Sequence, residues 1–209
     1  MANETSKVTY SFQGGELCLD FANTVGAHNS DHPSEGMRTY ADLLAWTRQA
    51  KLISSREEAE LLRATTQQSG RAEAVLARAH ELREAIFCVF MATAAGKTPA
   101  ADDLTILNAE VTEACSHARV ARTGSGFGWH WVGETEALDR MLWPVARSAA
   151  DLLVSGNLSR VRNCANATCG WLFYDTSRNN SRRWCDMRDC GNRDKVRRHY
   201  QRQRAATKR

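Results

Sequence analysis

The chain has 209 residues, of which 43% are hydrophobic and 25% are charged, and its formal net charge is +4. This is the composition of an ordinary globular protein, and it excludes a chain that is disordered along its length. No stretch reaches about 18 consecutive apolar residues, which excludes a membrane-spanning helix. The opening MANETSKVTY lacks the apolar segment of a signal peptide, and the seven cysteines are an odd number. We therefore expect a cytoplasmic protein with reduced thiols and no membrane partner.

The first 155 residues are predicted to be mostly helical. Helices are expected near residues 38–51, 55–69, 71–95 and 100–117, where apolar residues recur at helical spacing. Ser55 and Glu58 are expected to form a capping box at the start of the second helix. Gly96 ends the third helix, and Thr98-Pro99 opens the fourth with a cap and a first-turn proline.

A β-hairpin interrupts the helical pattern at ARVARTGSGFGWHWVG. Val120 lies on one side of a Gly-Ser-Gly turn, and the alternating Phe127, Trp129 and Trp131 lie on the other. Residues 135–156 then return to a helical pattern, in which Pro144 is expected to kink or split the helix. The short polar segment SGNLS at 155–159 predicts a boundary between two domains, residues 1–157 and 158–209.

The charge balance changes sign at this boundary. Residues 159–209 carry 14 lysines and arginines against 4 acidic residues, a net charge of +10. The other 158 residues carry 14 basic and 20 acidic residues, a net charge of −6. An acidic body joined to a basic module suggests that the module binds a polyanion.

Four cysteines in the basic module have the spacing of a zinc site. Cys164 and Cys169 form one C-x4-C pair, Cys185 and Cys190 form another, and 15 residues separate the pairs. Two close pairs with such a connector are typical of a tetrahedral site of four thiolates, which Zn²⁺ prefers. Chance pairs of buried thiols and disulfides remain the alternative. The remaining cysteines lie among apolar residues and are expected to be core thiols: Cys18, Cys88 and Cys115.

The residues around these pairs predict a treble-clef-like finger. GWLFYD favours a strand, RRWC a returning strand, and CGNRDKVRRHYQRQR a helix whose N-terminus faces the metal. The predicted fold is therefore mainly α: a helical N-terminal domain with a β-hairpin, followed by this small zinc finger. So short a segment buries little apolar surface, so we expect chelation to unfold residues 160–205 and to spare the helical body.

The module's basic side chains predict a surface that binds duplex DNA. On the last helix, Lys195, Arg198 and Arg202 share one face, and Val196 and Tyr200 share the opposite face, which is expected to pack on the hairpin. Arginine is the usual side chain for bidentate contacts to phosphates and guanine edges. The candidate DNA-binding residues are Arg178, Arg182, Arg183, Arg188, Arg193, Lys195, Arg197, Arg198 and Arg202. Arg193, Arg197 and Arg204 form a second cationic stripe on the flank of the same helix. The alternative is a merely solvated face, and Arg193 could instead pair with Asp175 or Asp189.

Several motifs resemble a known family. CGNR at 190–193, after SRRWCDM at 181–187 and CGWLFYD at 169–175, resembles the CGNR zinc-finger module. GGELCLDFANT at 14–24 resembles the opening of the ABATE domain that precedes this module. The resemblance implies a bacterial, stress-linked transcription regulator with a zinc-bound, DNA-binding C-terminal module. It also implies that the four paired cysteines are the zinc ligands and that Asn192 and Arg193 occupy signature positions.

The N-terminal body is a candidate sensor domain with a pocket for a small-molecule effector. In a helix over LCLDFANTV, Asp20, Asn23 and Thr24 gather on one face, where they could line a pocket with Trp129 and Trp131. The alternative is that Asp20 and Asn23 tie elements together through buried hydrogen bonds. That alternative is the more economical one.

Other functions compete with a DNA-binding regulator. A nuclease would need a catalytic histidine and a second metal, but His199 is the only histidine of the module and lies mid-helix. We therefore expect a protein that is not an enzyme. An RNA-binding or protein-interaction finger is a further alternative, with Trp171 or Phe173 stacking on unpaired bases if they are exposed. A small-molecule-binding protein with a purely structural finger is another. A dimer would suit a regulator, although no heptad pattern argues for it.

Overall fold

The structure, a computed structural model, describes residues 8–133 and 137–207. Its α-helices are α1 Leu17–Ala22, α2 Tyr40–Gln49, α3 Ser55–Thr65, α4 Ser69–Ala94, α5 Ala101–His117, α6 Leu142–Ser155 and α7 Asn192–Thr207. Its antiparallel strand pairs are β1 Val25–Gly26 with β2 Ser34–Glu35, β3 Ala118–Thr123 with β4 Gly126–Trp131, and β5 Val161–Asn163 with β6 Leu172–Tyr174. The predicted fold class is confirmed, because helices dominate and the β-structure is confined to small pairs. None of the described helices combines the length and the apolarity needed to cross a membrane.

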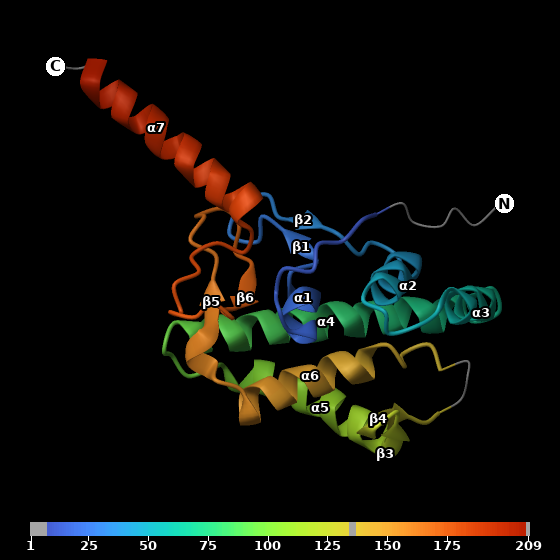
Figure 1. The fold of residues 1–209 in the computed structure, drawn as a ribbon. Helices are drawn as coiled ribbons and strands as arrows, with labels where there is room; N and C mark the ends of the chain where they lie inside the picture. The colour runs from blue at the N-terminus through green and yellow to red at the C-terminus, as the bar shows by residue number, and fades with distance from the viewer. Residues whose placement is uncertain (1–7, 134–136, 208–209) are drawn as a thin grey trace.

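Helix α4 is the centre of the body. Figure 1 shows it running through the middle, with α1 and α2 along one side and α5 and α6 along the other. Leu82, Ile86 and Phe90 repeat every four residues on one stripe of α4 and are fully buried. Cys18 and Phe21 of α1 belong to the same core. The short helix α1 is thereby fixed against a long and rigid one.

The helix starts show how local chemistry sets the boundaries. Ser54 caps α3: its hydroxyl accepts a hydrogen bond from the backbone N–H of Glu57, whose carboxylate accepts one from the N–H of Ser54 at 2.8 Å. The predicted box of Ser55 and Glu58 is therefore wrong by one residue. The sequence SSREE satisfies the capping spacing in both registers, so the pattern alone could not choose between them.

Pro144 neither kinks nor splits α6. The helix begins at Leu142, so the proline lies in the first turn, where backbone N–H groups have no partner within the helix. The prediction of a kink was wrong because it placed the helix start too early in the chain. The expected start near Thr135 lies outside the described residues.

The hairpin of the C-terminal module pairs different segments from those predicted. Strand β6 pairs with β5, with Val161 opposite Tyr174, and residues 181–185 form no strand. The carboxylate of Asp175 accepts hydrogen bonds from the N–H groups of Ser177 at 2.8 Å and Arg182 at 2.9 Å. This turn leads the chain away from β6 before a returning strand can form.

Helix α7 projects from the rest of the molecule, as Figure 1 shows. Val196 is 46% exposed and Tyr200 is 61% exposed, so the prediction that they pack on the hairpin is wrong. The five-residue π-turn Met187–Gly191 leads directly into the helix and sets its direction. An amphipathic pattern identifies the apolar face of a helix but not whether a partner lies within reach of it.

The cysteines outside the paired motif do not share one environment. Cys18 is fully buried, as predicted. Cys88 and Cys115 are exposed, so their assignment to the core is wrong. Both lie on long helices whose apolar stripe is occupied by other residues, such as Leu107 on α5 and Val89 on α4. Proximity to apolar residues along the chain does not place a side chain on the buried face of a helix.

Candidate metal centre and basic surface

Four cysteine sulfurs converge in the C-terminal module. Cys164 directly follows β5, Cys169 precedes β6, Cys185 follows the Asp175 turn, and Cys190 lies in the π-turn that enters α7. All four Sγ atoms lie within 4.8 Å of one another. The Sγ of Cys185 is 3.6 Å from that of Cys169 and 3.7 Å from that of Cys190. The two pairs therefore meet at one point, as their spacing predicts.

These separations fit a zinc ion. A Zn–S bond of about 2.3 Å in a tetrahedron places neighbouring sulfurs about 3.8 Å apart. A disulfide would need about 2.05 Å, and all four cysteines are free, so the disulfide alternative fails. The backbone N–H of Cys185 also points at the sulfur of Cys164, 3.5 Å away, as in a thiolate shell. With four protein ligands and no open position, the bound zinc stabilises the fold and supplies no catalytic water.

The protonation of the thiols depends on the cation. Burial and the neighbouring sulfurs of Cys169 and Cys164 raise the pKa of Cys190 to about 12. The pKa of Cys185 is raised too, first by its contacts to Cys164 and Cys169. A divalent cation reverses this balance because it stabilises four thiolates at once, so zinc binding releases protons.

Hydrogen bonds from α1 and the loop after it clamp the module to the body. The side-chain amide of Asn23, which is 4% exposed, donates to the carbonyl of Leu172 at 2.8 Å and accepts from the N–H of Leu172 at 2.9 Å. The indole N–H of Trp171 donates to the carbonyl of Val25 at 2.7 Å. The N–H of His28 donates to the carbonyl of Cys169 at 2.9 Å. Strand β6 and the residues just before it are therefore hydrogen bonded to the body.

We expect Asn23→Leu to loosen this clamp. Leucine has a similar size but leaves both buried backbone groups of Leu172 without partners, which should cost about 2–4 kcal/mol of unfolding free energy. Urea unfolding followed by circular dichroism measures the cost. Asn23→Asp is the matched comparison, because its carboxylate still accepts from the Leu172 N–H and only the donor is lost. Equal stability of Asn23→Leu and the parent chain would contradict a clamp.

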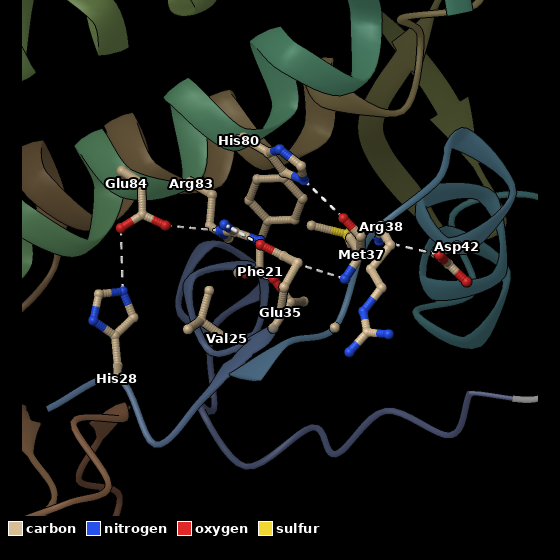
Figure 2. Close-up of polar contacts among 12 residues, drawn as sticks. Phe21, Val25, His28, Glu35, Met37, Arg38, Asp42, His80, Arg83 and Glu84 are labelled. Carbon is tan, nitrogen blue, oxygen red and sulfur yellow. Dashed lines mark hydrogen bonds and ion pairs between the residues drawn. The ribbon is translucent and has the colours of Figure 1, made fainter. Parts of the chain in front are cut away.

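A partly buried network of ion pairs joins α4 to the loop that carries His28 and Glu35. Figure 2 shows Arg83 and Glu84 of α4 facing Glu35 and His28. Arg83 is 4% exposed and donates to both carboxylate oxygens of Glu35 at 2.7 Å and to Glu84 at 3.0 Å. Glu84 in turn contacts the His28 ring at 3.1 Å, and this hydrogen bond is the main cause that lowers its pKa. The His28 ring also stacks on Phe87, 3.6 Å away.

Sequence reasoning missed this network. Arg83 lies four residues after Ala79 and three before Ile86, and both of these are fully buried. A charged residue on the core-facing stripe of a helix needs a buried partner. The position of Arg83 on that stripe was therefore the signal that the sequence offered. Its distant partner, Glu35, and the His28 ring that contacts Glu84 lie about 50 residues away in a loop, and no local pattern identifies them.

The predicted DNA-binding residues fall into two groups. Some are engaged in the fold. Arg182 donates to the carbonyls of Gln13 and Trp184 at 3.0 Å each, and its guanidinium lies 4.3 Å over the Phe173 ring. Arg193 pairs with Asp189 at 2.6 Å, one of the two partners considered. Arg197 and Arg198 both pair with Asp194.

The other predicted cations are exposed, and within residues 8–133 and 137–207 they have no ion-pair partner. They are Arg178, Arg183, Arg188, Lys195 and Arg202. Arg204, which belongs to the flanking stripe, is exposed in the same way. They lie along the turn after β6, the π-turn and α7, so a polyanion would meet unpaired charge on these segments.

The five predicted ligand-pocket residues do not share one cavity. Trp129 and Trp131 line a cleft of about 490 Å³ beside α6. Asp20, Asn23 and Thr24 line another cavity of about 200 Å³, together with Trp46 and other residues near the N-terminal segment. Asp20 accepts a hydrogen bond from the Gly14 N–H at 2.7 Å, and burial raises its pKa to about 6. Asp20 and Asn23 thus tie segments together, as the alternative interpretation holds.

Comparison with protein-family models covers most of the chain. A model named ABATE, described as "Putative stress-induced transcription regulator", matches residues 15–156. A model described as "CGNR zinc finger" matches residues 160–203, which include all four converging cysteines. A search of curated proteins found no match.

Proposed function

The chain belongs to the ABATE family and carries a CGNR zinc finger, and from that premise we propose that this zinc-binding regulator binds duplex DNA through its finger and α7. The two matches support a regulator of transcription with a structural zinc. The observation that carries the proposal further is α7, a helix of 16 residues that projects from the body and presents unpaired cations.

The dimensions and chemistry of α7 suit a DNA groove. Sixteen residues of α-helix extend about 24 Å, and the major groove of about 12 Å width admits one helix. Lys195 and Arg202 would contact phosphates on one side of such a helix. Arg188 on the π-turn and Arg178 and Arg183 near the Asp175 turn would contact the adjacent backbone. In this assignment Arg182 orders the finger and is not a DNA contact.

The test is the salt dependence of binding to a duplex of mixed sequence. We expect the double substitution Lys195→Gln/Arg202→Gln to weaken binding roughly tenfold or more and to reduce the slope of log affinity against log salt by about 2. Fluorescence anisotropy over a series of KCl concentrations measures both. Arg56→Gln, which removes an exposed charge from the body, is the control and should change neither quantity. An unchanged slope in the double variant would contradict docking through α7.

The rival functions have less support. Phe173 is fully buried and the Trp171 indole is hydrogen bonded to Val25, which weakens base stacking on an RNA strand. Among the described residues, the paired cysteines are the one group of His, Cys, Asp and Glu suited to a metal, and His199 lies in α7 away from them. A metal-dependent nuclease therefore has no support here, and the two matched families are described as a regulator and a zinc finger. A regulator of this kind would act in the cytoplasm, and competition between duplex DNA and RNA tests the choice of nucleic acid.

A further inference from the structure

A cleft lies in the body beside the two hairpin tryptophans, Trp129 and Trp131. The cleft has a volume of about 490 Å³, within the range of small-molecule sites. Strand β4 and helix α6 form most of it, with Glu16 at the start of α1 and Tyr174 at the end of β6. Body and finger therefore both contribute to one cavity.

The apolar part of the cleft is aromatic. Trp129 is 47% exposed, Trp131 and Tyr174 are partly exposed, and Pro144 and Leu152 complete the wall. Within the described part of the chain, the Tyr174 hydroxyl makes no hydrogen bond. Exposed indole rings offer broad π faces, which attract flat apolar groups and organic cations.

The charged part of the cleft leaves one carboxylate uncompensated. Arg147 is already satisfied: it pairs with Asp151 at 2.8 Å, and its guanidinium lies 4.2 Å over the Trp129 ring. The Glu16 carboxylate, in contrast, has no hydrogen-bond or ion-pair partner among the described residues. Glu16 is partly buried, which raises the pKa of its carboxyl group and disfavours the charged form. A positively charged ligand would supply the missing partner.

We propose that this cleft binds a small organic cation, in which an ammonium group is joined to a flat apolar body. The ammonium group pairs with Glu16, and the apolar body lies against Trp131 and Trp129. An anion of the same shape is rejected, because it would meet Glu16 and find Arg147 already paired. This inference goes beyond DNA binding and does not depend on it.

The site also touches the finger. The N–H of Tyr174 donates to the carbonyl of Gly14 at 2.7 Å, two residues before Glu16. Asp175, the next residue, accepts the hydrogen bonds that form the turn toward Cys185. An occupant therefore contacts body and finger strand at once and should stabilise their docking.

Three probes of one shape test the charge preference on the zinc-loaded full chain. Phenethylamine, 2-phenylethanol and phenylacetate share a benzene ring and differ in charge. Isothermal titration calorimetry should show that the amine binds about tenfold tighter than the alcohol, and that the acid does not bind detectably. Binding should also change the tryptophan fluorescence. Equal binding of amine and acid, or no binding of the amine at millimolar concentration, would overturn the proposal.

Substitutions locate the binding site. Glu16→Gln should abolish the preference for the amine over the alcohol while the alcohol still binds. Glu16 makes no side-chain capping bond to α1, so the variant should fold normally, which its melting curve checks. Trp129→Leu should weaken amine and alcohol alike. Glu60→Gln, which changes a partly exposed carboxylate of α3 outside the cleft, should change nothing. If Glu16→Gln keeps the preference, or if the free chain dimerises through Trp129 and excludes the probes, the inference is wrong.

Discussion

Removal of zinc is expected to unfold residues 176–207 and to leave the helical body and the β5–β6 hairpin folded. Cys164, Phe173, Cys185 and Cys190 form a small apolar cluster of their own, too small to stay ordered without the metal. A structural zinc supplies about 10–16 kcal/mol of apparent binding free energy, more than such a segment can replace. Val161 and Leu172 pack in the main core and keep the hairpin in place. The expected region is thus narrower than residues 160–205, which the sequence suggested.

Hydrogen–deuterium exchange with and without a chelator measures this directly. Amides of α7 should lose their protection, whereas those of α4 and of β6 should keep it. Cys190→Ser should reproduce the effect of the chelator and abolish duplex binding, because α7 begins two residues later. Cys88→Ser removes an exposed thiol outside the cluster and is the control. Unchanged protection of α7 in the metal-free chain would show that zinc does not hold this segment.

Replacement of Arg83 by methionine is expected to destabilise the body by about 3 kcal/mol. Loss of the buried guanidinium removes the ion-pair partner of Glu35 and leaves Glu84 with only its His28 contact. For a chain of this size, that destabilisation lowers the Tm by roughly 6–12 °C. Methionine keeps the packing of the aliphatic stem, so the loss reports the ion pairs with Glu35 and Glu84. The loop that carries His28 should also exchange its amides faster.

Thermal unfolding of the zinc-loaded protein measures the shift. Arg56→Met is the matched control, because Arg56 is exposed and, among residues 8–133 and 137–207, its ion-pair partner is Glu60 on the same helix. The Tm of the Arg56→Met variant should equal that of the parent chain within the error of the measurement. A double variant, Arg83→Met/Glu35→Gln, should recover part of the loss, since it removes one of the stranded charges. If the Tm of Arg83→Met equals that of the parent chain, the ion-pair network does not stabilise the body.

The zinc centre could be predicted from sequence because its signal is local. Two C-x4-C pairs bring their own thiolates together, and only the closure of the connector between them is a tertiary event. The helices of the body were predictable for the same reason, since apolar spacing reflects burial on one face. The hairpin over residues 118–131 followed from alternation around a glycine turn.

Predictions of which segments pair, pack together or share a cavity were less successful. The strand-forming residues of GWLFYD identified a strand but not its neighbour, which is β5 and not RRWC. Val196 and Tyr200 form an apolar face that no described element covers. Trp129 and Asn23 were expected in one pocket, yet they line different cavities.

The sequence by itself determined the four sulfur ligands, the helical character of the body and the separation of charge between its two parts. These properties depend on residues close together in the chain, whose spacing fixes which side chains can meet. The tertiary structure alone decided that Asn23 bonds to Leu172, that Arg83 reaches Glu35, and which arginines remain unpaired. Such contacts join residues far apart in sequence, and they form only where packing has already brought two backbones together.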